Sequence, residues 1–188
     1  MVLVGMVGAG VMTAREAGLR AGTPPAVAVL LPDDTCTAPC WRGIRSVVTS
    51  KEEGTVILNQ LPDAQPIQDY AWRFTYEDEV YIAWFLSSLT LLAPHVRLGD
   101  ILAAMGEPDY QTQQAAVNLN TGAKEKLISL YYEKQQVIVL VSVSSQGRVS
   151  VEMPLAAFEY PDNYYAQPFY SWEWLGAIWL AKYPPVVE

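Results

Sequence analysis

The chain has 188 residues, a formal net charge of −8 and a hydrophobic content of 51%. This apolar content is sufficient for a packed core and argues against disorder of the whole chain, and the length suits one domain with tails. The charge argues against a nucleic-acid partner, because binding to phosphates needs clustered Lys and Arg, and the 12 basic residues here are scattered.

Residues 1–21 form an apolar leader or membrane anchor, and its uninterrupted apolar run, residues 1–12, is too short to cross a bilayer as an unbroken helix, which needs about 20 residues. It also lacks a positively charged start. We favour the remnant of an export signal or a signal anchor. The alternative is a short anchor or buried helix, in which Gly5, Gly8 and Gly10 allow close packing against a partner.

Residues 22–35 are predicted to be a Pro-rich spacer. Proline favours extended backbone and is not tolerated inside a helix. We therefore expect this segment to run along the surface of the domain or to pair at an edge of a sheet.

Both cysteines of the chain, Cys36 and Cys40, follow the spacer. A structural zinc site needs four ligands, and the chain offers only these two and the distant His95, so no metal site is predicted. A redox motif has two residues between its cysteines, and here there are three. We predict a local Cys36–Cys40 disulfide, which persists only in an oxidising compartment. Two free thiols in a cytosolic protein are the alternative.

The stretch Cys36-Thr-Ala-Pro-Cys40-Trp41-Arg42-Gly43-Ile44, followed by a Thr-capped helix, resembles the opening of a family of uncharacterised bacterial envelope proteins. Many of those proteins carry a signal or lipoprotein leader. The family usually has Pro-Gly before the Thr, whereas this chain has Arg45-Ser46-Val47-Val48. The resemblance extends over about residues 36–140 and implies an exported location, without catalytic residues.

The first predicted helix begins with a capping box of Thr49 and Glu52 and runs to residue 60, with Val56, Ile57 and Leu61 on one face. Alternation then predicts a strand over residues 70–76, an acidic turn at 77–79 and one longer strand over 80–92.

A second helix is predicted from about Arg97 to Met105, with Gly106 at its C-terminal end and Pro108 preventing continuation. Turn residues then separate further strand candidates over residues 113–119, 127–132, 136–143 and 148–153.

These patterns predict an α+β domain over residues 36–154, with helices packed on an antiparallel sheet. A finer hypothesis is that two tandem helix-plus-hairpin units make it up. The run from Leu98 to Asp109 also resembles the helix-to-strand junction of SmpA/OmlA-type lipoproteins and of the β-lactamase-inhibitor-protein fold. That resemblance implies helices on an antiparallel sheet and action by binding proteins.

Residues 155–188 form an aromatic C-terminal extension with three open interpretations: packing onto the sheet, docking on a protein or on the bilayer surface, or stacking on sugars. The predicted docking residues are aromatic, the type that anchors interfaces. They are Tyr164, Tyr165, Phe169, Tyr170, Trp172, Trp174, Trp179 and Tyr183.

No motif for nucleophilic, phosphate-binding, dinucleotide-binding or zinc-protease chemistry is present. A loop residue such as His95 is expected to be solvated or to cap a turn, and the acids at 77–79 are expected to form a solvated turn. We therefore predict no catalytic residues and no cofactor.

The resulting hypothesis is a non-enzymatic, extracytoplasmic and membrane-attached binding module, an accessory subunit that docks on a membrane protein complex or an envelope component. The alternative is a carbohydrate-binding or carbohydrate-active protein that uses the C-terminal aromatics. A cleft with two carboxylates about 5 to 10 Å apart beside an exposed Trp would favour the enzyme.

Overall fold

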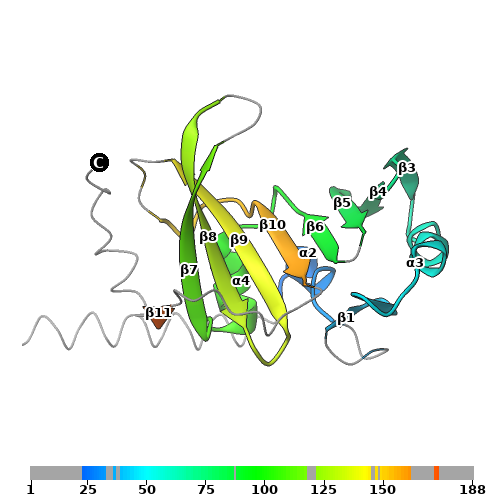
Figure 1. Cartoon of the computed structure of the whole chain (residues 1–188), viewed down its shortest axis with the longest axis horizontal. Coiled ribbons are helices and arrows are strands. Elements are labelled where there is room, and N and C mark those ends of the chain that lie inside the picture. Colours follow the sequence, from blue (N-terminus) through cyan, green and yellow to red (C-terminus); the bar gives the residue numbers. More distant parts are fainter. Residues whose placement is uncertain are drawn as a thin grey trace, which may run out of the picture.

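A computed structural model describes residues 23–32, 36, 39–86, 88–117, 122–144, 147 and 149–161, and the backbone of residues 172–173. The main feature is a nine-stranded antiparallel sheet with the strand order β11-β7-β8-β9-β10-β6-β5-β4-β3 (Figure 1). Its strands are β3 (Gln65–Gln68), β4 (Ala71–Tyr76), β5 (Glu79–Phe85), β6 (Leu89–Leu92), β7 (Tyr110–Val117), β8 (Lys124–Tyr132), β9 (Val137–Ser144), β10 (Ala157–Tyr160) and β11 (Trp172–Glu173).

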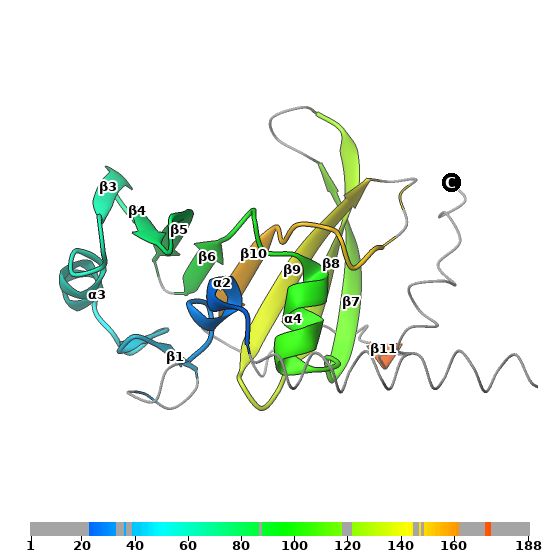
Figure 2. The ribbon, with the colours of Figure 1, turned by 180° about the vertical axis from the view of Figure 1, so that it is seen from behind.

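Three short helices are described, namely α2 (Pro25–Ala28), α3 (Lys51–Leu58) and α4 (Leu98–Met105). Seen from behind, α2 and α4 lie in front of the sheet and therefore share one of its faces (Figure 2). The predicted antiparallel sheet is confirmed, and it dominates the described part of the chain, because the helices are few and short.

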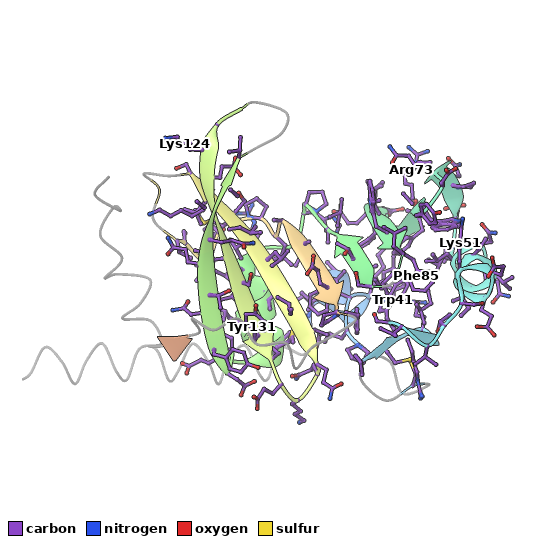
Figure 3. All side chains as sticks on the ribbon, viewed as in Figure 1. Trp41, Lys51, Arg73, Phe85, Lys124 and Tyr131 are labelled. Atoms are coloured by element: carbon purple, nitrogen blue, oxygen red, sulfur yellow. A yellow bond between two sulfur atoms is a disulfide. The ribbon has the colours of Figure 1, made fainter. Side chains whose placement is uncertain are left out.

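Alternation along the strands produces the core. In β5 and β9 every second residue is buried, and these residues belong to one apolar cluster. Trp41 and Phe85, both labelled in Figure 3, belong to it as well.

The predicted single strand over residues 80–92 is wrong, because the segment folds back on itself. β5 and β6 form a hairpin in which Phe85 pairs with Leu89, and the Leu86 N–H donates to the Ser88 carbonyl. The continuous apolar pattern concealed this turn, since both arms of the hairpin face the same core.

The predicted strand over residues 148–153 is also wrong. The carbonyls of Val151 and Met153 instead accept hydrogen bonds from the Gly99 and Leu98 N–H groups in the first turn of α4. The strand that follows is β10, which lies between β9 and β6 in the middle of the sheet. The sheet therefore extends beyond the predicted domain end at residue 154.

The predicted spacer is part of the core rather than a surface segment. Pro25 begins α2, where proline is tolerated because the first N–H of a helix has no intrahelical partner. Val27 and Leu30 are fully buried. Three aromatic side chains donate hydrogen bonds to carbonyls of this segment: Trp41 Nε1 to Val29, Tyr81 Oη to Ala26 and Tyr160 Oη to Leu30.

The first predicted helix is present as α3, but its cap lies one residue later than predicted. Ser50 and Glu53 form the capping box. The buried face also differs, because Gly54 and Leu58 point into the core whereas Val56 is 58% exposed. The predicted glycine end of α4 is confirmed by Gly106, which has a φ of 82°.

The two halves of the sheet are arranged similarly. α3 precedes β3 to β6, and α4 precedes β7 to β9, with β10 between the two sets. Each set contains more strands than the predicted hairpin. Descent from a duplicated unit stays a prediction.

Candidate functional site

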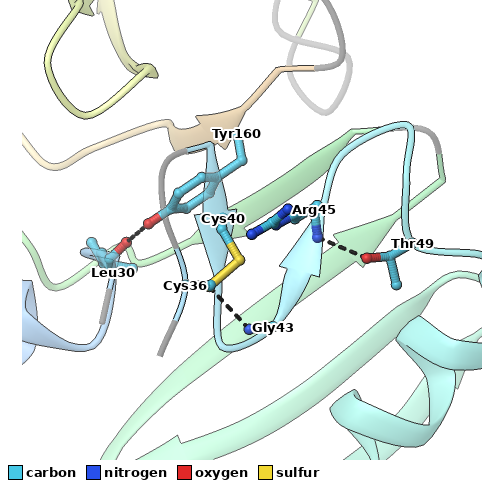
Figure 4. The surroundings of a disulfide bond; sticks show 7 residues. All are labelled: Leu30, Cys36, Cys40, Gly43, Arg45, Thr49 and Tyr160. Carbon is cyan, nitrogen blue, oxygen red and sulfur yellow. Dashed lines mark hydrogen bonds between the residues drawn. A yellow bond between two sulfur atoms is a disulfide. The ribbon is translucent and has the colours of Figure 1, made fainter. Parts of the chain in front are cut away.

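The cysteine stretch folds into a small disulfide-bonded hairpin. Its strands, β1 (Cys40–Trp41) and β2 (Ile44–Arg45), are joined by Arg42 and Gly43, which both have positive φ as a tight hairpin turn requires. The predicted Cys36–Cys40 disulfide is confirmed, and the Gly43 N–H lies 3.2 Å from Cys36 Sγ (Figure 4). A disulfide is consistent with an oxidising, extracytoplasmic compartment.

This hairpin is tied to the centre of the sheet. Trp41 is fully buried, and the Ser46 hydroxyl donates to the Tyr160 carbonyl at 2.5 Å. The Arg45 N–H donates to Thr49 Oγ1 at 2.8 Å, which gives Thr49 a role in the turn instead of the predicted helix cap (Figure 4). The disulfide therefore stabilises the structure locally, and its cysteines are not available as nucleophiles.

A separate concave surface lies near the turn between β3 and β4 and the end of β5, and we call it the aromatic hollow. It has a volume of about 460 Å³ and is lined by Gln68, Asp69, Tyr70, Trp84 and Leu86. Ligand sites generally combine apolar walls with a few polar groups, as this surface does.

Strand register positions the hollow. Gln68 pairs with Ala71, and Ala71 pairs with Trp84, so the three residues form one row across β3, β4 and β5. Because neighbours in such a row share a face, the short Ala71 side chain separates two long ones. The Phe85 N–H donates to the Tyr70 carbonyl at 2.9 Å and holds the turn against β5.

The walls of the hollow are unusually accessible for their residue types. Trp84 is 39% exposed and Leu86 is 60% exposed. Lys51, the first residue of α3, places its Nζ 4.1 Å from the centre of the Tyr70 ring, a cation–π contact that orients this wall. One carboxylate, that of Asp69, lines the hollow.

The sequence reasoning missed this site. The predicted strand over residues 80–92 contains Trp84 without singling it out, and Gln68 and Asp69 precede the predicted strand over residues 70–76. The available signal was the alternation of Tyr81, Ala83 and Phe85 on the core face, which directs Trp84 to the opposite face.

On the same face as Trp84, the row continues through Thr90 to Glu159. Burial raises the pKa of the Glu159 carboxyl above its usual range. Glu159 lies two strands from Trp84 and is not among the residues that line the hollow.

His95 packs near the acidic turn. Its Nδ1 is 3.5 Å from Glu79 Oε2, and its ring meets the Tyr81 ring edge-on at a centroid distance of 4.6 Å. Burial, together with the charges of Glu79 and Glu77, raises the pKa of Tyr81 to about 12. The predicted solvated turn is confirmed, because residues 77–79 are exposed.

The predicted docking residues lie outside the described part of the chain, except for the backbone of Trp172. That backbone belongs to β11, where Trp172 pairs with Gln111 at the β7 edge of the sheet. The prediction that these aromatics dock on a partner or a membrane is therefore not tested.

Within the described ranges, no helix is long and apolar enough to span a membrane. In the same ranges, no group of three or more His, Cys, Asp or Glu side chains could hold a metal ion. Comparisons of the chain with protein-family models, curated proteins and solved structures found no match. The resemblance to envelope proteins stays a prediction.

Proposed function

We propose that this chain is a non-enzymatic binding module of an oxidising, extracytoplasmic compartment, and that it binds an envelope component through the aromatic hollow. The observation that carries the proposal is a concave surface of about 460 Å³ in which an indole and an aliphatic side chain remain accessible. Exposed Trp in a concave setting is the residue type that contributes most to binding energy.

The hollow is preformed, which supports a binding role. Trp84 lies within a paired strand, and the Tyr70 turn is held by the hydrogen bond from Phe85. A ligand that enters a preformed site does not have to order the walls, so more of the contact energy appears as affinity.

The lining favours binding over glycoside hydrolysis. That reaction requires two carboxyl groups flanking one bond. The hollow combines an exposed Trp with the single carboxylate of Asp69, which is the combination expected of a lectin-like or docking protein.

Two parts of the sequence hypothesis accompany this proposal as predictions. Attachment to a membrane depends on the leader and the C-terminal aromatics, which lie outside the described residues. A membrane protein complex as the partner is one form that an envelope component can take, and a glycan is the other.

The proposal is tested by site-specific photocrosslinking. A benzophenone amino acid at Leu86, in the hollow, is compared with the same group at Val117, which is 57% exposed at the end of β7. Benzophenone inserts into C–H bonds of proteins and glycans alike, so the readout is an adduct of defined mass after irradiation with envelope fractions of the native host.

We expect an adduct of one defined component from position 86 that disappears when Trp84→Ala is added, and no such adduct from position 117. The absence of an adduct at 86, or the same adducts from both positions, would contradict binding at the hollow.

A further inference from the structure

We infer that the ligand of the aromatic hollow is a neutral saccharide, an inference that rests on the proposed binding function. One sugar ring stacks on the accessible face of Trp84, and its hydroxyl groups bond to Gln68 and Asp69. The residues that line the hollow are different from the C-terminal aromatics, to which the carbohydrate-binding alternative of the sequence analysis assigned sugar stacking.

The hollow provides space for a ring, with a volume of about 460 Å³. Gln68 and Trp84 are two strands apart, which corresponds to roughly 10 Å at the usual strand spacing. Ala71, which lies between them in the row, is fully buried and does not line the hollow, so the open space is the one bounded by Gln68, Asp69, Tyr70, Trp84 and Leu86. A flat ring can therefore lie against the indole while its edge faces the polar side chains.

The polar groups match hydroxyl chemistry. A carboxylate accepts hydrogen bonds at both oxygens, and a carboxamide both donates and accepts. Asp69 and Gln68 together can therefore bond to sugar hydroxyls that donate and to hydroxyls that accept.

Charge selects against ionic ligands. An anion would meet Asp69 on a chain whose formal net charge is −8. A cation would compete with the Lys51 ammonium, which already faces the Tyr70 ring. With the Asp69 carboxylate disfavouring anions and the Tyr70 ring already in contact with an ammonium, a neutral ligand is the best match.

A purely apolar ligand, such as a leucine-rich peptide, fits less well. It would bury the Asp69 carboxylate and the Gln68 amide without replacing their hydrogen bonds to water, which is unfavourable. A sugar replaces those bonds and still offers its C–H face to the indole.

The test is fluorine NMR of the full chain labelled with 5-fluorotryptophan. The chain contains six Trp, and Trp84→Phe identifies the Trp84 signal by its loss. The probes are cellohexaose, maltohexaose and chitohexaose, with hexagalacturonate as the anionic comparison and a leucine-rich amphipathic peptide as the apolar one.

We expect at least one neutral hexasaccharide to shift the Trp84 signal saturably. Asp69→Asn should weaken that binding about tenfold or more, because the neutral amide donates where the carboxylate accepted. Asp63→Asn, a matched control at an exposed residue outside the hollow, should leave it unchanged.

Failure of all three neutral sugars, or equal weakening by both Asn variants, overturns the saccharide inference. A Trp84 shift with the peptide alone also overturns it, but leaves the binding function in place. If no probe shifts Trp84 and position 86 also gives no crosslink, both proposals fail.

Discussion

Val47 is held in a conformation that suits glycine. Its φ is 68°, in the left-handed region that is sterically costly for a β-branched residue, and its side chain is 66% exposed. The exposed Val therefore occupies a turn whose backbone conformation would be less strained with glycine.

Val47→Gly is expected to stabilise the protein. Removing the side chain relieves about 1 to 2 kcal/mol of left-handed strain, and the extra freedom of glycine in the unfolded chain reduces the gain to about 0.5 to 1 kcal/mol. Urea unfolding measures the change. Val48→Gly, at a 74% exposed neighbour without positive φ, should destabilise instead, and stabilisation by both variants would contradict the explanation.

At the scale of elements, the N-terminal cap of α3 makes stability depend on pH. The hydrogen bonds between Glu53 and Ser50 hold the pKa of the Glu53 carboxyl below its usual value. A carboxyl with a lowered folded pKa stabilises the protein above its unfolded pKa, and this contribution disappears as pH falls through the folded pKa.

Glu53→Gln should therefore lower the free energy of unfolding at pH 7, and the difference from the parent should shrink as pH falls below the ordinary Glu pKa and vanish below the lowered folded pKa. Unfolding curves from pH 3 to pH 7 measure this. Glu52→Gln is the matched control, because Glu52 is the acid of the cap predicted from sequence. A larger pH effect for Glu52→Gln than for Glu53→Gln would favour the predicted capping box of Thr49 and Glu52.

Packing between α3 and β5 depends on the lack of a side chain at residue 54. A Cβ at Gly54 would lie 2.3 Å from Cε1 and 2.5 Å from Cδ1 of Phe85, a ring that is 1% exposed. Gly54→Ala should thus destabilise by about 1 to 3 kcal/mol, although Ala favours helix by up to about 1 kcal/mol.

Thermal unfolding checks this expectation, with Val56→Ala as the control on the exposed side of α3. Val56→Ala should be neutral or slightly stabilising, since Ala is the better helix former. Adding Phe85→Leu should recover part of the loss caused by Gly54→Ala. If Gly54→Ala were equally destabilising in the Phe85→Leu background, the clash with the Phe85 ring would not be the cause of the lost stability.

For the whole molecule, α2 is an integral part of the folded unit. A chain that starts at residue 36 loses the buried Val27 and Leu30 side chains, each worth about 1.5 to 3 kcal/mol. Unpaired aromatic donors cost about 1 to 3 kcal/mol each. These losses are comparable with a typical stability of about 5 to 15 kcal/mol.

A chain of residues 36–188 should therefore lack a cooperative thermal transition by circular dichroism, whereas one of residues 23–188 should retain it. As a milder variant, Leu30→Ala in the full chain should cost about 2 to 5 kcal/mol. Cooperative unfolding of the shorter chain at the parent temperature would show that residues 22–35 are a spacer after all.

Much of the fold could be predicted because its signals are local. Alternation identified β4, β8 and β9, and Gly106 marked the end of α4. The wrong predictions also rested on local patterns, but the contacts that overturned them are tertiary or lie outside the predicted element. Residues 80–92 looked like one continuous strand because β5 and β6 each direct alternate residues into the same core. The cap of α3 is Ser50 and not Thr49, because the Thr49 hydroxyl accepts a hydrogen bond from the Arg45 N–H.

The candidate site was harder to predict than the disulfide. Cys36 and Cys40 are four residues apart, so their pairing needs no knowledge of the fold. Gln68 and Trp84 are separated by a whole hairpin, and the row that joins them exists only once β3, β4 and β5 are in register.

By itself, the sequence determined the antiparallel class, the Cys36–Cys40 disulfide and the glycine that ends α4, since each follows from neighbours along the chain. Only the tertiary structure decided that β10 lies between β9 and β6, that α2 belongs to the core and that an aromatic hollow forms. The physical reason is that strand order and register are set by long-range pairing and shared burial, which one-dimensional periodicity does not encode.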